Sequence, residues 1–224
     1  MVNKRLIPPV YGNLYYSLRE LSLKLDDLLK NCTKKSNQTL LDFGCGSKPY
    51  KSLVEKYGVK YLGADLSIVS DIDIEIDIEG TLQLKDESVD ILLSSQVLEH
   101  VYNTDKYLKE CYRVLKPDGN LIITTHGHWV FHPDPNDYWR WTSQGLKEII
   151  KKHSFEIEHF SGIMNIKSVA LQYLQDTIRT KLKFKIVITL FTYFMQVLIR
   201  INEKFSEKSD HDSGIYVVKA TKKS

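Results

Sequence analysis

A strongly apolar segment that runs directly into two glycines constrains the fold of this chain more than any other feature. Residues 40–46 begin with two leucines, as a buried strand does, and end at Gly44 and Gly46. Glycines at these positions let the backbone turn sharply and let a ligand approach it without a Cβ in the way. Because open α/β sheets bind ligands at the carboxyl ends of their strands, this segment predicts a strand, a tight turn and a small-molecule site.

The residues after this turn bear on the kind of ligand. A dinucleotide-binding fingerprint would need a third glycine where the chain has Pro49. This difference counts against a nicotinamide or flavin nucleotide and suits a cofactor without a pyrophosphate. The next predicted strand leads to Asp65, whose carboxylate can accept two hydrogen bonds from a ribose diol.

Strands and helices alternate along most of the chain, which indicates a parallel α/β sheet. Strands are predicted at 39–43, 60–64, 72–78, 89–94, 121–125, 155–159 and 215–220. Apolar periodicity and capping signals predict helices at 14–29, 50–56, 107–115, 143–152 and 184–201. We expect one domain over 1–224, made of an N-terminal lid and helix (1–37), a cofactor-binding core (38–160), a helical insertion (162–208) and a last strand (214–220).

Charge and cysteine content narrow the possible partners and compartments. The net charge is only +3, with both signs mixed along the chain, so we expect no nucleic-acid partner. The cysteines are three and widely spaced, which argues against a disulfide framework or a zinc cluster and favours a reducing, cytoplasmic setting. Residues 1–10 contain no apolar run, so we expect no secretory signal there.

Four further motifs follow the glycine turn in a fixed order. They are Gly-Ala-Asp at 63–65, Asp-Glu-Ser-Val-Asp at 86–90, Val-Leu-Glu-His-Val at 97–101 and Arg-Val-Leu-Lys-Pro-Asp-Gly at 113–119. Together with 40–46, these motifs resemble those of class I S-adenosylmethionine-dependent methyltransferases of the type 11 group. The resemblance implies methyl transfer from S-adenosylmethionine. It also implies a Rossmann-like seven-stranded sheet, mostly parallel with an antiparallel last strand and helices on both faces.

The resemblance also implies which residues hold the cofactor. Asp42, Gly44 and Gly46 would contact its amino acid part, and Asp65 its ribose. Asp77 and Ile78 end the third predicted strand beside the adenine, and Gln96 follows the fourth near the methionine part. The full predicted set is Asp42, Gly44, Gly46, Asp65, Leu66, Asp77, Ile78 and Gln96.

The segment after the fifth predicted strand is unusually dense in polar and aromatic residues. It follows the end of a strand, so we expect it to lie at the same edge of the sheet as the cofactor. Aromatic faces with paired polar groups suit a polyol or sugar acceptor. The predicted acceptor-binding residues are His128, His132, Asp134, Asp137, Tyr138 and Arg140. The segment also resembles methyltransferases of bacterial surface-glycan and antibiotic-sugar pathways, which implies a role in polysaccharide biosynthesis.

Other interpretations of this segment stay open. Arg140 could pair with an acidic acceptor group or form a structural salt bridge. His126, His128 and their acidic neighbours could ligate a metal, but without a second ligand cluster we expect none. Methylation of a hydroxyl needs a base, and His100 and His126 are the candidates, although either could serve only to hold the loop.

The segment 184–201 is the most apolar of the chain. It is about the minimum length for a membrane span, but a regular polar stripe counts against spanning. The stripe consists of Lys185, Thr189, Thr192, Gln196 and Arg200. The helix could instead cover its own domain, form a homodimer interface, or lie on the inner face of a membrane with the help of the basic residues at 179–185.

Taken together, these features predict an enzyme that methylates oxygen of a small polar acceptor or a lipid-linked sugar. One alternative is a nucleotide- or NAD-binding enzyme on a similar sheet, which Pro49 argues against. Another alternative is a non-catalytic scaffold that keeps the cofactor pocket, which the dense polar segment argues against.

Overall fold

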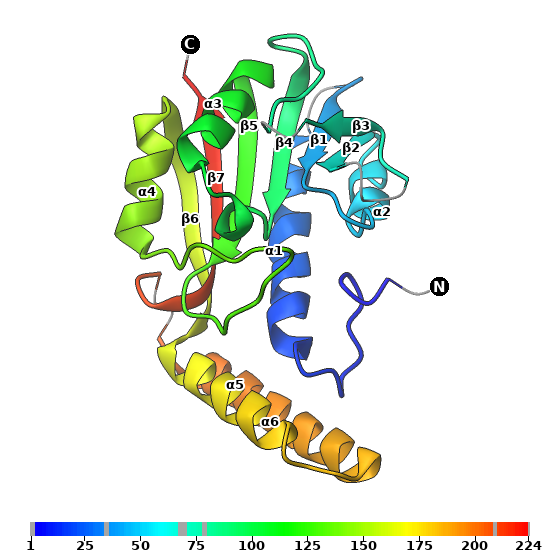
Figure 1. Cartoon of the computed structure of the whole chain (residues 1–224), viewed down its shortest axis with the longest axis vertical. Coiled ribbons are helices and arrows are strands. Elements are labelled where there is room, and N and C mark those ends of the chain that lie inside the picture. The colour runs from blue at the N-terminus through cyan, green and yellow to red at the C-terminus, as the bar shows by residue number, and fades with distance from the viewer. Residues whose placement is uncertain (1–2, 34–35, 67–70, 78–79, 208–209, 224) are drawn as a thin grey trace.

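A computed structural model describes residues 3–33, 36–66, 71–77, 80–207 and 210–223. Its seven-stranded sheet has the order β3-β2-β1-β4-β5-β7-β6 (Figure 1). The strands are β1 Thr39–Phe43, β2 Lys60–Leu66, β3 Ile74–Ile76, β4 Val89–Ser95, β5 Leu115–His126, β6 Phe155–Asn165 and β7 Ser213–Lys222. The helices are α1 Tyr15–Cys32, α2 Lys51–Glu55, α3 Thr104–Val114, α4 Ser143–Lys152, α5 Ile166–Arg179 and α6 Lys185–Phe205, with a short 3-10 turn η1 Leu98–His100.

Strand direction follows the predicted pattern. Strands β3, β2, β1, β4 and β5 pair in parallel, whereas β7 runs antiparallel to both β5 and β6. Strand β6 therefore points the same way as the parallel strands. The Rossmann-like sheet with an antiparallel last strand is thus confirmed.

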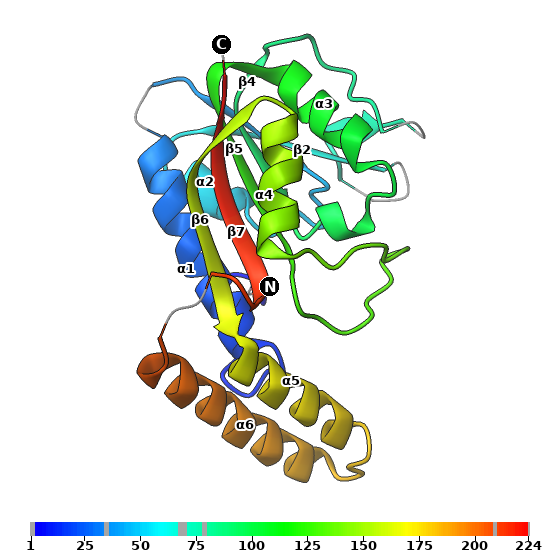
Figure 2. The same cartoon turned by 90° about the vertical axis from the view of Figure 1, so that its left-hand side faces the viewer.

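Helices cover both faces of the sheet because its central strands are buried on both sides. In β1, Leu40 belongs to the apolar cluster that includes α1, while Leu41 belongs to the cluster that includes α3 and α4. This alternation is the period-two pattern of a strand. Figure 2 shows α1 and α4 on opposite sides of β6 and β7.

Several boundaries differ from the predicted ones for local reasons. Strand β6 continues to Asn165, beyond the predicted end at 159, because it stays paired with β7 as far as Ser213. Helix α4 has the predicted bounds, but its cap is Thr142, whose hydroxyl accepts a 3.0 Å hydrogen bond from the Gly145 amide. Strand β5 begins at Leu115, before the predicted start at 121, and residues 116–119 lie opposite an irregularity in its pairing with β4.

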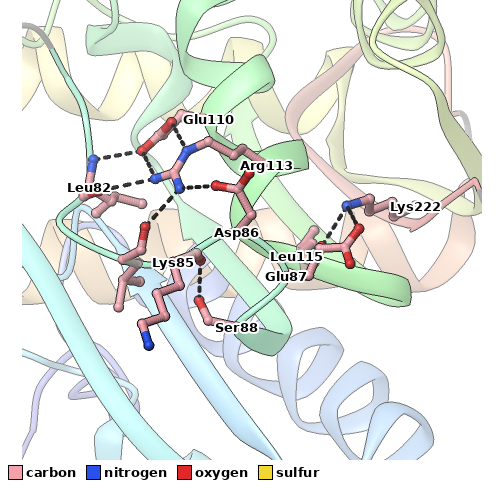
Figure 3. A network of polar contacts seen from close by, with 10 residues as sticks. Leu82, Lys85, Asp86, Glu87, Ser88, Glu110, Arg113, Leu115 and Lys222 are labelled. Atoms are coloured by element: carbon pink, nitrogen blue, oxygen red, sulfur yellow. Dashed lines mark hydrogen bonds and ion pairs between the residues drawn. The ribbon is translucent and has the colours of Figure 1, made fainter.

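Arg113, the first residue of the motif at 113–119, has a structural role. Its guanidinium binds Glu110 and Asp86, each at 2.6 Å, and it donates to the carbonyl of Leu82 at 3.1 Å (Figure 3). The Leu82 amide in turn donates to Glu110 at 2.7 Å. These contacts fasten the connection between β3 and β4 to α3, so the motif supports the sheet edge rather than the ligand site.

Helices α5 and α6 form a hairpin that projects from the end of the sheet (Figures 1 and 2). The hairpin is inserted between β6 and β7, as the predicted insertion was. Asn165 caps α5, since its side chain accepts hydrogen bonds from the amides of Lys167 and Ser168.

Candidate active site

A cavity of about 460 Å³ opens at the carboxyl ends of β1 and β4. The strand order reverses between these two strands, which is where open α/β sheets bind ligands. Its volume lies within the range of roughly 300–1,000 Å³ that is usual for small-molecule sites. One wall comes from the chain after β1 and from the end of β2, and the opposite wall from the chain after β4.

The glycine turn after β1 lines one wall of this cavity. Gly44 has a φ of +87°, and a Cβ built on it would lie 2.5 Å from Cγ2 of Val97. Gly46 has a φ of +50°, and a Cβ there would meet no atom within 4 Å, so the backbone at Gly46 adjoins open space. Gly44 therefore lets two loops approach, while Gly46 leaves a cradle that a ligand can enter.

Asp65 ties the end of β2 to this turn. Its carboxylate accepts hydrogen bonds from the amides of Gly46 at 2.6 Å and Leu66 at 2.8 Å. Both Asp65 and Leu66 line the cavity. A carboxylate has about four acceptor positions, so Asp65 keeps capacity for the hydroxyls of a bound diol.

Asp42 lies behind the cavity and is not among the residues that line it. Its buried carboxylate accepts a 2.6 Å hydrogen bond from the Tyr61 hydroxyl and joins β1 to β2. Burial raises the pKa of Asp42 to about 7, although the Tyr61 bond opposes this shift. Asp42 thus stabilises the pairing of β1 with β2 from behind the cavity. This position differs from the predicted contact between Asp42 and the cofactor.

The predicted adenine side is also displaced. Asp77 accepts a 2.7 Å hydrogen bond from the Thr81 amide and does not line the cavity, whereas Ile76 and Gly80 do. Ile78 lies outside the described residues.

Gln96 lines the cavity directly after β4. Its φ is +58°, its amide donates to the Thr124 carbonyl at 2.8 Å, and its Nε2 donates to the Thr124 hydroxyl at 3.1 Å. The neighbouring strand β5 therefore fixes Gln96 in an uncommon backbone conformation beside the ligand space.

Of the two predicted bases, only His100 lines the cavity. Its Nδ1 contacts the backbone carbonyl oxygen of Asn136. A carbonyl oxygen can only accept, so Nδ1 is the ring nitrogen that carries the hydrogen in this contact. His100 is thus held in the tautomer that can take a proton at Nε2.

His126 is placed differently. It is 4% exposed and stacks on Trp129 with ring centroids 5.0 Å apart. Its Nδ1 lies 3.0 Å from Oε1 of the fully buried Glu99, although the two atoms are not aligned as a hydrogen bond. Burial lowers the pKa of His126 to about 3 and raises the pKa of Glu99. His126 is a neutral packing group beneath the loop, which corrects its predicted place at the reacting atoms.

Arg140 holds the loop after β5 in shape. Its guanidinium makes a bidentate pair with Asp137, with both contacts at 2.6 Å, and donates to the carbonyls of Trp129, Val130 and Trp139. The pair lowers the pKa of Asp137 to about 2. These contacts occupy all five donors of Arg140, so the geometry favours the structural salt bridge over an acceptor contact.

Of the other predicted acceptor-binding residues, some lie at or near the cavity and others contact different parts of the chain. Asp134 lines the cavity, and the ring centroid of His132 lies 5.8 Å from that of His100. His128 faces Asp212 at 3.5 Å, and Tyr138 packs edge-on against Tyr102. Among the described residues, no three His, Cys, Asp or Glu side chains are grouped so as to hold a metal.

Two cavity residues have no motif signal in the sequence. Arg5 reaches the cavity from the N-terminal segment. Tyr107 reaches it from α3, where its hydroxyl donates to Ser94 at 2.9 Å. An aromatic residue on a helix is usually a packing residue, and Arg5 lies outside every periodic segment, so only the tertiary fold reveals both.

Comparison with known proteins identifies the domain. Residues 41–123 match the family described as "Methyltransferase domain". These residues form a class I, S-adenosylmethionine-dependent methyltransferase domain. The match runs from the strand before the glycine turn into β5, and this part of the chain supplies most of the residues that line the cavity.

Relatives of this methyltransferase domain act on different acceptors. A "probable S-adenosylmethionine-dependent methyltransferase" of Mycolicibacterium smegmatis is 24% identical over 74% of the chain and 68% of that protein. The mitochondrial ubiquinone biosynthesis O-methyltransferase of Rattus norvegicus is 31% identical over 45% of the chain, and phosphoethanolamine N-methyltransferase 2 of Caenorhabditis elegans is 30% identical over 42%. The matched regions cover only 36% and 25% of those two enzymes.

Solved structures share the fold. The [4+2]-cyclase SpnF aligns with a TM-score of 0.61 and 19% identity, over 92% of this chain and 82% of that one. Phosphoethanolamine N-methyltransferase 2 of Haemonchus contortus, solved with phosphomonomethylethanolamine and S-adenosylhomocysteine, aligns with a TM-score of 0.57 and 19% identity, over 90% and 53%. At this identity the likeness concerns architecture and not the acceptor.

The cavity of the methyltransferase domain fits S-adenosylmethionine. The cradle at Gly46 has no side chain to block a ligand, and the Asp65 carboxylate beside it suits a ribose diol. The absence of a third glycine at Pro49 agrees with a cofactor that has no pyrophosphate.

Proposed function

We propose that this methyltransferase domain methylates a hydroxyl oxygen of a polar, sugar-like acceptor, with His100 as the general base. The observation that carries the proposal is the contact between His100 Nδ1 and the Asn136 carbonyl, which leaves Nε2 as the proton acceptor. A hydroxyl is a weak nucleophile until it loses its proton, so its methylation gains most from such a base.

The cofactor would be held by residues from both cavity walls. Gly44 and Gly46 would leave room for it, Asp65 would accept from its ribose, and Gln96 would adjoin its methionine part. When bound, S-adenosylmethionine supplies a methyl carbon that its positively charged sulfur activates.

His100 would then take the proton that the acceptor hydroxyl loses as the new carbon–oxygen bond forms and the carbon–sulfur bond breaks. Asn136 would keep the ring oriented during this step, because its carbonyl fixes the position of Nδ1. General base groups placed in this way contribute roughly 10²- to 10⁴-fold to a rate.

The class of acceptor rests on the loop between β5 and α4. Asp134 lines the cavity and His132 lies beside His100, so the acceptor would meet carboxylate and imidazole groups. Polyols and sugars are recognised by such polar groups together with aromatic faces. The resemblance of the loop to enzymes of glycan pathways supports a role in polysaccharide biosynthesis.

The test is methyl transfer from isotopically labelled S-adenosylmethionine to a panel of sugars, polyols, phenols and amines. We expect labelled product from hydroxyl acceptors, and His100→Gln should lower kcat at least about 100-fold. His126→Gln is the matched control, because His126 ends the neighbouring strand β5 but lies outside the cavity.

Calorimetric binding of S-adenosylhomocysteine shows that each variant still forms the cofactor site. If the two variants lose kcat equally, or if only amines are methylated, the proposal is wrong. Binding of NAD in place of S-adenosylhomocysteine would support the nucleotide-enzyme alternative. Cofactor binding without turnover of any acceptor would support the non-catalytic scaffold.

A further inference from the structure

Helix α6 turns its polar side toward the protein and its apolar side outward. Its buried residues are Thr192, Met195, Gln196 and Ile199. On the opposite side, Ile186, Leu190 and Phe194 are 71%, 63% and 56% exposed. At 100° per residue, the exposed apolar side chains of α6 fall within about 120° of its circumference. We call them the outer apolar face: Ile186, Val187, Leu190, Tyr193, Phe194, Ile201 and Phe205.

Gln196 fixes this orientation. Its Nε2 donates to the carbonyl of Asn13 at 2.9 Å and to the side-chain oxygens of Gln172 at 3.1 Å and Gln175 at 2.8 Å. Its Oε1 accepts from the amide of Tyr16 at 2.9 Å. Rotating α6 to hide its apolar face would leave these buried amides without partners, which is costly. The outer apolar face is therefore a built feature of the hairpin.

Positive charge gathers at the far end of the same hairpin. Between residues 177 and 202 there are five basic residues and no acidic one, although the whole chain has a net charge of only +3. Four of the five, Arg179, Lys181, Lys183 and Lys185, lie at the tip and are exposed. Apolar and basic groups thus occupy adjoining parts of one projecting surface.

We propose that the α5–α6 hairpin lies on an anionic membrane surface, with its outer apolar face in the interface and its basic tip among the lipid headgroups. Amphipathic helices bind membranes through these two contributions, and each basic residue adds to the attraction of an anionic leaflet. A homodimer contact would cover the apolar face but would give the basic tip no partner of opposite charge. The membrane explains both features.

Within the described residues, α6 is the one helix long and apolar enough to cross a membrane by length and composition. Spanning would require Gln196 to leave its partners on α5 and the N-terminal segment. A position parallel to the membrane keeps those hydrogen bonds.

The direction of β6 relates the hairpin to the cavity. Because β6 runs the same way as β4 and β5, its end at Asn165 and the start of α5 lie at the carboxyl edge of the sheet, where the cavity opens. A hairpin on the membrane would therefore hold this edge close to the lipid surface. That position suits an acceptor carried on a lipid, although membrane binding itself does not depend on the acceptor.

Flotation of the full chain with vesicles tests the proposal. We expect the protein to float with phosphatidylcholine vesicles that also contain the anionic lipid phosphatidylglycerol. Retention on pure phosphatidylcholine should be at least about tenfold lower, and added salt should reduce binding to the anionic vesicles. Leu190→Glu/Phe194→Glu and, separately, Lys181→Glu/Lys183→Glu should each abolish flotation.

Matched controls change equally exposed side chains elsewhere. Leu23→Glu on α1 and Lys30→Glu/Lys109→Glu on α1 and α3 should float as the unchanged protein does. Binding of S-adenosylhomocysteine checks that all variants fold. If the cofactor assignment is wrong, the unchanged protein also does not bind it, whatever the result of flotation. The proposal is overturned if the unchanged protein does not float, or if the hairpin variants float as well as the controls. A dimer that Leu190→Glu/Phe194→Glu dissociates, together with no flotation, would instead assign the outer apolar face to a second copy of the chain.

Discussion

A Cβ on Gly44 would lie 2.5 Å from Cγ2 of Val97, so these two residues bring the turn after β1 and the chain after β4 into direct contact. The two loops form opposite walls of the cavity. The absence of one methyl group at Gly44 therefore sets how closely the walls approach, while the φ of +87° independently disfavours any other residue there.

Replacing the two glycines of the turn should have unequal effects. Gly44→Ala combines backbone strain with a clash and should destabilise the fold by about 2–5 kcal/mol. Gly46→Ala meets no atom within 4 Å and should cost only the backbone strain of a positive φ, about 1–2 kcal/mol. Thermal unfolding measures both losses of stability. The double variant Gly44→Ala/Val97→Ala should regain the stability that Gly44→Ala loses through the clash. Equal losses for the two single variants would contradict this account.

Asp65 should be essential for cofactor affinity. Asp65→Ala removes the carboxylate that accepts from the Gly46 and Leu66 amides, and with it the proposed ribose contact. Hydrogen bonds to a charged group contribute about 1.5–3 kcal/mol, so we expect at least about tenfold weaker binding of S-adenosylhomocysteine by calorimetry. Glu55→Ala, an exposed carboxylate on α2, should bind as the unchanged chain does. Unaltered affinity in Asp65→Ala would place the ribose elsewhere.

Asp42 should give the fold a distinctive pH dependence. Its pKa is about 7 in the folded protein and 3.8 as the reference value, so the folded state binds its proton more tightly. Stability should therefore fall as the pH rises from about 4 to 7, by at most about 4 kcal/mol from this residue. Asp42→Asn still accepts from Tyr61 but cannot ionise, so its free energy of unfolding should rise relative to the unchanged protein over that range.

Urea unfolding at several pH values measures this difference. Glu55→Gln on the surface of α2 serves as the control, since an exposed carboxylate should leave the pH profile unaltered. Parallel profiles for Asp42→Asn and the unchanged chain would show that Asp42 ionises normally.

The Arg140–Asp137 pair should govern order in the loop over the cavity. Arg140→Lys loses the bidentate contact and the carbonyl contacts to Trp129 and Val130, because one ammonium cannot reproduce the guanidinium fork. We expect amide exchange and proteolysis over 129–138 to become faster in Arg140→Lys, and equally fast in Asp137→Asn. The double variant should show little further increase in either rate, because both residues belong to one pair. Arg19→Lys, which alters a partly buried pair with Glu20 on α1, should leave the loop protected.

The sequence predicted the sheet and the glycine turn after β1 because both depend on local patterns. The run from Leu40 to Gly46 combines an apolar strand with a turn that needs glycine, and Asp65 follows at the end of the next strand. Each of these features has a physical reason that can be recognised without the fold. The predicted strand at 39–43 and the parallel order of the core are confirmed for this reason.

The acceptor side was harder to predict because its residues differ by orientation, not by type. His100 and His126 look equivalent in the sequence, yet one faces the cavity and the other is buried against Glu99 and Trp129. Asp42 looked like a ligand contact because it precedes Gly44, but its position in the strand points it toward Tyr61. The sequence is compatible with either an acceptor contact or a structural salt bridge for Arg140, and only its partners within the loop distinguish the two.

The pairing of Asn165 with Ser213 has an evolutionary consequence. The hairpin leaves and rejoins the sheet at neighbouring positions of two adjacent strands, so a short β-turn could replace it without altering the register of β6 and β7. Such an appendage can be exchanged while the catalytic strands keep their sequence. Loss of this helical pair would leave the strands around the cavity in place and remove the surface that we propose to bind a membrane.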